Sequence, residues 1–413
     1  MSKITVRIGF VPSYRFGYTE WCERMRSESL AAFRRVEGME VIALHASPDG
    51  ETLDAERGHA PYGAVQTLVQ AEAAAEYFHR QRVDGLILCP LDFGDERSAT
   101  KIAEKLKVPV LLYATKEPPA RQDAGLSRVS DSYCGNLSMA SGLYRRKIPF
   151  RYAGLFFPDE PGLQHEVQEF VRAVAVVRGL QGAYLGQVGV RPPPFETVAY
   201  DEAALIAKFG QTVVYAEIAD ILDRARKYTG DDPHLQAVIE EIRATVPVIT
   251  VASDYLQNAA RLELALVEFW EKNHLSAMAM QCWPTIMREM NLNPCALFGR
   301  MTGRHMLTAC ETDLLGALAM LVNYRAALGE GLPHFVDWTI QHRQDPNCLL
   351  AWHCGNAPVA LAADPGRTAL RSRSNMTAEL PVIEGDGMAG LYQFQVKPGK
   401  VTFCRLAEYE AAT

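Results

Sequence analysis

The first 115 residues alternate short apolar runs with amphipathic segments, and this alternation constrains the fold more than any other feature of the chain. Continuous runs of valine, isoleucine and leucine are typical of parallel strands that are buried on both faces. Runs separated by helical segments indicate βαβ units. The pattern predicts strands at residues 4–12, 39–46, 84–90 and 108–114, and helices at 20–36 and 64–80. We therefore expect a doubly wound α/β domain at the amino terminus.

The alternation resumes near Arg151 and then stops, which predicts three domains in the 413 residues. A second doubly wound α/β domain is expected after the first. Beyond about residue 328 the helical period disappears, and short β-like runs separated by Gly, Pro and Asp predict a small antiparallel β-barrel or sandwich. The expected domains are 1–148, 149–328 and 329–413.

Composition and charge exclude several classes of protein. The net charge of −7, without a cluster of Lys or Arg, argues against a nucleic-acid surface. No GxGxxG follows the first predicted strand, so no dinucleotide fingerprint is present. No apolar stretch approaches the roughly 20 residues of a membrane span. The nine cysteines are scattered without a CxxC pair, and the amino terminus lacks a leader pattern; we expect reduced thiols and a cytoplasmic protein.

Three short motifs place ionisable residues among apolar neighbours. They are CETDLLGALAML at 310–321, HFVDW at 334–338 and AWHCGNAP at 351–358, and they contain Glu311, Asp337 and His353. Two carboxylates and an imidazole suit a divalent ion such as Mn²⁺ or Mg²⁺. Each residue alone also fits an ordinary structural role. Glu311 would suit a helix amino terminus, Asp337 would suit a turn, and His353 would suit a buried core position. Their combination indicates a metal-assisted enzyme at the boundary of the second and third predicted domains.

These motifs resemble segments of L-fucose isomerase and its relatives. CETDLLGALAML is similar to the segment in which a glutamate opens a helix, HFVDW to the segment with the second carboxylate, and WHCGNAP to the His-Cys-Gly strand of shorter members. DSYCGNLSMASGLYRR at 131–146 is similar to a further segment near the junction of the two α/β domains. The order of two α/β domains and a β-rich tail also matches the L-fucose and L-arabinose isomerase architecture.

The resemblance implies a metal-dependent isomerase that interconverts an aldose and a ketose, with a pentose or 6-deoxyhexose of the L-fucose, D-arabinose or L-arabinose type as substrate. Glu311 and Asp337 would be catalytic, and both would bind Mn²⁺ (or Mg²⁺) together with His353. His305 and His342 are the alternative histidine ligands. A divalent ion on two sugar oxygens would stabilise the negative charge of an enediol. The resemblance also implies a homo-oligomer, a trimer or hexamer, whose sites are completed by a neighbouring subunit.

Further residues are candidates for binding the substrate. Arg15, Phe16 and Trp21 follow the first strand and could cover a neighbour's pocket. Cys282 and Trp283 end a predicted strand before Glu311, and Asn356 belongs to the histidine motif. Ordinary loop or core roles are the alternative for each of these residues.

Two other functions stay open at this point. The first is an enzyme of the same fold with altered enediolate chemistry, such as an epimerase, a lyase or an aldol-type enzyme, which would keep the three ligands. The second is a non-catalytic sugar-binding protein, which would need neither the metal nor buried carboxylates.

Overall fold

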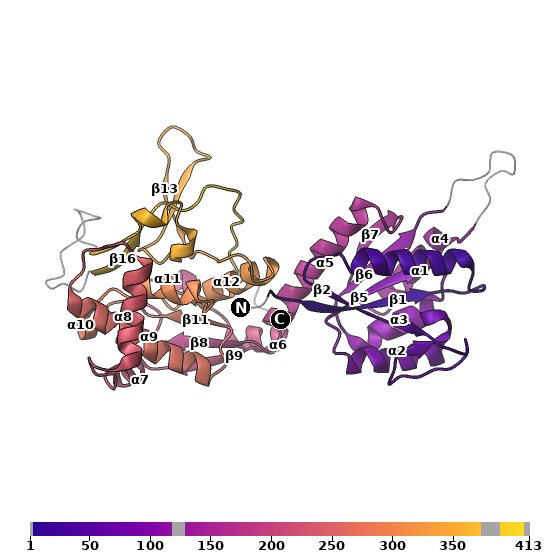
Figure 1. The fold of residues 1–413 in the computed structure, drawn as a ribbon, viewed down its shortest axis with the longest axis horizontal. Coiled ribbons are helices and arrows are strands. Elements are labelled where there is room, and N and C mark those ends of the chain that lie inside the picture. The colour runs from indigo at the N-terminus through magenta and orange to yellow at the C-terminus, as the bar shows by residue number, and fades with distance from the viewer. Residues whose placement is uncertain (1–2, 118–128, 373–388, 409–413) are drawn as a thin grey trace. The chain divides into compact units, whose positions relative to one another are not determined.

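The chain divides into two compact units, Met1–Arg178 and Gly179–Thr413, each built on its own parallel sheet. The computed structural model describes residues 3–117, 129–372 and 389–408 (Figure 1). The predicted α/β class with parallel sheets is confirmed.

The first unit contains a five-stranded parallel sheet in the order β2-β1-β5-β6-β7. Its strands are β1 (Val6–Ser13), β2 (Met39–Ala43), β5 (Gly85–Pro90), β6 (Val110–Thr115) and β7 (Phe150–Phe156), and two short strands, β3 (His45–Ala46) and β4 (His59–Ala60), pair beside it. Strand β7, which the sequence pattern assigns to the second domain, is the edge strand of this first sheet. The sheet order reverses direction between β1 and β5, where ligands commonly bind in open α/β sheets.

Helices cover both faces of this sheet, as the uninterrupted apolar strands predict (Figure 1). They are α1 (Glu20–Phe33), α2 (Leu68–Arg80), α3 (Glu96–Leu106), α4 (Ser132–Arg145) and α5 (Pro161–Leu180), with a 3-10 turn at Pro61–Gly63. Apolar side chains of α2, α3 and α4 form one core with the strands. On the other face, Phe33 of α1 meets Phe10 and Tyr113 edge to face. The unit therefore has a core on each side of the sheet.

The second unit contains a four-stranded parallel sheet in the order β12-β11-β8-β9. The strands are β8 (Tyr184–Val188), β9 (Thr212–Ala216), β11 (Ala277–Met280) and β12 (Thr308–Ala309). The helices are α6 (Glu202–Phe209), α7 (Ile218–Ala225), α8 (Pro233–Thr245), α9 (Ser253–Lys272), α10 (Thr285–Met290), α11 (Cys295–Gly303) and α12 (Leu314–Ala326). One core joins α7, α8, α9 and α11 to this sheet.

The residues after α12 form small sheets within the second unit. Strands β13 (Asp337–Gln341) and β14 (Leu349–Trp352) make an exposed antiparallel hairpin. Strand β15 (Ala369–Ser372) pairs antiparallel with β16 (Ala389–Gln393) and parallel with β10 (Val248–Ile249). Short 3-10 turns lie at Glu196–Val198, Val359–Leu361 and Pro365–Arg367. The predicted antiparallel barrel is not confirmed, because β10, which precedes α9 in the chain, belongs to one of these sheets.

Within the described ranges, none of the helices combines the length and apolar character that a bilayer crossing requires.

Candidate active site

Glu311 lies in the four-residue connection between β12 and α12. Glu311 and Thr312 both have left-handed backbone conformations, with φ of 60° and 53°. Such conformations cost about 1–3 kcal/mol each for residues other than glycine and persist only where surrounding contacts hold them. Here the Thr312 amide donates to the Met280 carbonyl at 3.2 Å, and the Thr312 hydroxyl donates to the Val190 carbonyl at 3.1 Å. The loop thereby holds the Glu311 side chain in a defined position.

Asp313 fixes the other end of this loop to the helix. Its carboxylate accepts a hydrogen bond from the Gly316 amide at 2.8 Å and so caps α12. The same buried carboxylate is paired with Arg405 near the carboxyl end of the described chain. Arg405 also donates to the Thr197 carbonyl at 3.2 Å. Neither Asp313 nor Arg405 was predicted from the sequence. The one signal for Asp313 is its place directly before the apolar run of α12, where an acidic residue is typical of a helix cap.

The structure brings the three predicted ligands together. The Nε2 atom of His353 lies 4.0 Å from a carboxylate oxygen of Glu311 and 4.0 Å from one of Asp337. His353 directly follows β14 and is 3% exposed, while Asp337 is the first residue of β13. The Glu311 side chain is 21% exposed and that of Asp337 is 66% exposed. The three predicted ligands thus range from the exposed carboxylate of Asp337 to the buried imidazole of His353.

The donor set fits a hard divalent ion. The buried Nε2 of His353 has no hydrogen-bond partner among the described residues, and burying an unsatisfied polar atom is costly. Groups 4.0 Å apart leave room for an ion about 2.1 Å from each. His353 Nδ1 accepts from the Cys354 amide at 2.8 Å, so the proton of the neutral ring is on Nε2. An ion bound at Nε2 would displace this proton. A neutral ring would then carry its proton on Nδ1, which could no longer accept the hydrogen bond from the Cys354 amide.

Burial and charge set different proton affinities within the site. Burial raises the pKa of Glu311; the nearby His353 acts against this and the Asp337 charge adds to it. Burial lowers the pKa of His353, but contact with Cys295 and the charges of Glu311 and Asp337 outweigh it, so the pKa lies above its usual value. Two carboxylates in unequal surroundings can take separate acid and base roles.

The remaining candidates of the second unit lie in varied surroundings. Cys282 is buried, and its sulfur lies within 4.8 Å of a Glu311 oxygen. Trp283 is half-buried and meets Phe195 edge to face at 6.0 Å. Asn356 is buried. Cys282 is thus the member of this group that is placed beside the carboxylates.

The alternative histidines have other contacts. His305 lies against Tyr324, with ring centroids 5.5 Å apart. His342 is exposed in the hairpin turn, where its Nδ1 accepts from the amides of Gln344 and Asp345 at 3.3 and 3.1 Å. The histidine that lies between the two carboxylates is therefore His353, the first choice from the sequence.

The candidates of the first unit lie around the switch point of its sheet. Asp92, which sequence reasoning missed, is buried and accepts from the amides of Arg15, Phe16 and Gly94 at 2.7–3.1 Å. Arg15 stacks over the Phe93 ring at 4.2 Å and pairs with Glu96. The Phe16 side chain is largely exposed. These contacts fix the conformation of the loop after β1.

Trp21 lies in the first turn of α1, close in sequence to this loop. Its ring is half-buried, and the Arg24 guanidinium lies 5.8 Å from its centroid. Its indole nitrogen is buried without a hydrogen-bond partner. The predicted role of Arg15, Phe16 and Trp21 in a neighbour's pocket stays a prediction.

Known proteins similar to this chain share one enzyme class. A family model for the amino-terminal domain of fucose/sulfoquinovose isomerase matches residues 25–181. The sulfoquinovose isomerase of Alkalicoccus urumqiensis is 26% identical over 78% of this chain and 69% of its own length. That of Priestia aryabhattai is 25% identical over 84% of this chain and 74% of its own. These matches support the predicted likeness to the L-fucose isomerase-like superfamily.

The named relatives and the family-model match confirm the expected class of protein, an enzyme that isomerises a sugar between aldose and ketose forms. Among solved structures, a periplasmic solute binding protein from Actinobacillus succinogenes 130z with bound D-allose aligns with 81% of this chain and 96% of its own, at 12% identity. Its TM-score of 0.19 is too low to support any argument about fold or function.

Proposed function

We propose that this chain is a metal-dependent aldose–ketose isomerase that acts on a 6-deoxyhexose through an enediol, with Glu311, Asp337 and His353 as the ligands of Mn²⁺ or a similar divalent ion. The single observation that carries the proposal is the approach of both carboxylates to the unpartnered Nε2 of the buried His353. The bound ion would act as a Lewis acid on two adjacent sugar oxygens.

The residues of the chain account for the proton transfers. Isomerisation moves a proton between C1 and C2 and another between the two oxygens, which needs an acid and a base. Glu311 would supply one of these groups from the more buried side of the site. Asp337 lies on the solvent side and can exchange protons with water. Half-buried Trp283 offers an apolar face against which a sugar ring can stack.

The relatives suggest the substrate. Those described above are named sulfoquinovose isomerases, and sulfoquinovose is a 6-deoxyhexose that carries a sulfonate on C6. We therefore place sulfoquinovose first among the 6-deoxyhexoses, ahead of L-fucose and of the pentoses D-arabinose and L-arabinose.

The test is an assay with metal-free protein and this panel of sugars in deuterated water. Chelation should reduce aldose-to-ketose conversion to background, and Mn²⁺ should restore it. Deuterium should enter the product at the carbon where the proton exchanges with solvent. Activity that persists without any divalent ion would contradict the metal-dependent mechanism, while turnover of pentoses alone would overturn the choice of a 6-deoxyhexose.

We also propose that the chain forms a homo-oligomer through the hairpin that carries Asp337. Large apolar side chains are exposed on the hairpin and on the nearby carboxyl-terminal segment, namely Trp338, Ile340, Leu349, Leu350, Val401 and Phe403. Trp338 and Phe403 pack edge to face, so the two segments share one surface. An apolar patch of this kind marks an interaction site.

Light scattering should therefore give a mass above that of one 45.8 kDa chain. The double variant Trp338→Ser with Ile340→Ser should lower that mass. The control is Tyr144→Ser, which changes an exposed aromatic residue of the first unit and should leave the mass unchanged. A monomeric wild-type protein at micromolar concentration would refute this arrangement.

A further inference from the structure

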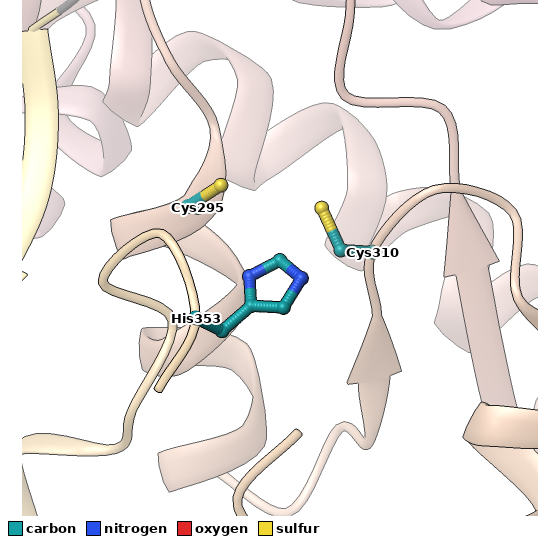
Figure 2. A group of neighbouring side chains, drawn as sticks. All are labelled: Cys295, Cys310 and His353. Atoms are coloured by element: carbon teal, nitrogen blue, oxygen red, sulfur yellow. The ribbon is translucent and has the colours of Figure 1, made fainter. Parts of the chain in front are cut away.

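A group of thiols lies directly behind the predicted metal ligands. The sulfurs of Cys295 and Cys310 and a ring nitrogen of His353 all lie within 4.8 Å of one another, and all three residues are buried. Figure 2 shows the imidazole pointing between the two sulfurs. Cys354 contacts Cys295, and Cys282 contacts Cys310, so four thiols form one connected group.

These cysteines come from four separate places in the chain. Cys282 follows β11, Cys295 begins α11, Cys310 follows β12 and Cys354 follows His353. A buried free cysteine usually behaves as a small apolar residue, and each of them alone would be explained that way. Convergence of several sulfurs on one imidazole nitrogen is a different arrangement, because it places a complete set of metal-ligand atoms together.

The two sides of His353 offer ligands of different chemistry. On one side, Glu311 and Asp337 supply carboxylate oxygens, which suit Mn²⁺ or Mg²⁺. On the other side, Cys295 and Cys310 supply sulfur, which zinc and other thiophilic ions prefer. The imidazole nitrogen suits ions of both kinds.

We propose that Cys295, Cys310 and His353 form a second site, for a thiophilic divalent ion such as Zn²⁺, and that this site shares His353 with the predicted Mn²⁺ site. Two thiolates at 2.3 Å from a tetrahedral zinc lie about 3.8 Å apart, so the sulfurs need to close by about 1 Å at most. Binding converts both thiols to thiolates and releases two protons to solvent. Cys282 or Cys354 is in reach of the fourth position.

The burial of the ligands indicates a path to this second site. Exposure falls from Asp337 through Glu311 to His353, Cys295 and Cys310. An ion that enters past the carboxylates therefore meets the imidazole before the thiols. The Nδ1 atom of His353 accepts from the Cys354 amide, so ions on both sides would compete for Nε2, and occupation of the thiol side would remove a ligand from the carboxylate side. Zn²⁺ would then inhibit the isomerase; this consequence rests on the proposed function, whereas binding itself does not.

Direct binding is tested with Co²⁺ as the probe on the full-length, metal-free protein. Thiolate ligation of Co²⁺ produces a sulfur-to-metal charge-transfer absorbance in the near ultraviolet that carboxylate ligation does not. We expect this absorbance at one equivalent of Co²⁺ and its loss when Zn²⁺ is added. Cys295→Ser with Cys310→Ser should abolish it. The control, Cys134→Ser with Cys348→Ser, removes the two exposed thiols and should leave it unchanged.

A wild-type protein without the charge-transfer absorbance would overturn the proposal, whatever the variants do. Absorbance that is lost in the control pair but kept in the Cys295/Cys310 pair would overturn it as well. Circular dichroism of each pair shows whether the variant is folded.

Sharing of His353 is tested by Zn²⁺ inhibition of the Mn²⁺-loaded protein, with each variant compared with its own zinc-free rate. The zinc concentration for half-inhibition should rise at least about tenfold in Cys310→Ser, since one thiolate ligand is lost. Equal inhibition of wild type and Cys310→Ser would contradict the shared ligand. If no sugar is converted but the cobalt–thiolate absorbance is present, the proposed function fails and the thiol site stands. If sugar is converted but the absorbance is absent, the proposed function stands and the thiol site fails.

Discussion

Replacement of Glu311 by glutamine should lower kcat for aldose–ketose conversion by about a hundred- to ten-thousand-fold, the range expected for loss of a general acid–base group. Gln keeps the size of the side chain but can neither take up nor release the proton. Because Glu311 lies in a loop held by its backbone contacts, the substitution should leave the fold intact. The measurement is steady-state turnover of the best sugar in the panel with saturating Mn²⁺.

A matched variant, Glu217→Gln, changes an exposed glutamate at the start of α7 in the same unit and should retain wild-type turnover. Deuterium incorporation shows whether a slow Glu311 variant has lost proton abstraction itself. Loss of both conversion and exchange indicates that proton abstraction has failed. A variant with more than about a tenth of the wild-type kcat would be inconsistent with a catalytic Glu311, given the size of acid–base effects in enzymes.

Replacement of Glu263 by glutamine should lower the free energy of unfolding by about 3–5 kcal/mol, the usual cost of removing one member of a buried ion pair. Glu263 of α9 is fully buried and accepts from Arg300 through both oxygens, at 2.8 and 3.1 Å. Arg304 adds a third contact at 2.8 Å. Burial acts to lower the pKa of Arg300, but Glu263 outweighs this and raises it.

Urea unfolding of the full chain, followed by circular dichroism, measures this effect. Glu241→Gln is the matched control, because Glu241 also pairs with Arg300, at 3.3 Å, but is half exposed. Its loss should cost at most about 1 kcal/mol. The arrangement also bears on the site, since the helix that Arg300 anchors begins with Cys295. Equal unfolding midpoints for both variants and wild type would show that the buried pair contributes nothing to stability.

The strands and helices that were predicted for the first 115 residues followed from the sequence because each depends on a local pattern. GLILCP is apolar throughout and VRIGFVPS is apolar apart from Arg7 and Ser13, and they form the central strands β5 and β1. The helix predicted at 64–80 contains α2, which begins at Leu68 and ends at Arg80. Strand β7 shows the limit of local patterns, since nothing in FRYAGLF tells which of two sheets it joins.

The candidate site, too, could be predicted only in part from the sequence. The choice of Glu311, Asp337 and His353 came from ionisable residues in apolar surroundings and from the family resemblance. Their approach to within 4.0 Å depends on a hairpin and a left-handed loop, and no residue pattern specifies either one. Asp92 escaped notice because an acidic residue after a strand is common, and its three amide partners become visible only when the loops fold together.

The sequence by itself determined the α/β class, the succession of elements and the identity of three ionisable residues that needed a partner. Tertiary structure alone decided that Cys295 and Cys310 lie beside His353 and that Cys354 and Cys282 contact these two thiols. The physical reason is the range of the interactions: periodicity and burial preference act over a few residues, whereas sulfur, imidazole and carboxylate groups meet only after the sheet and its helices have packed.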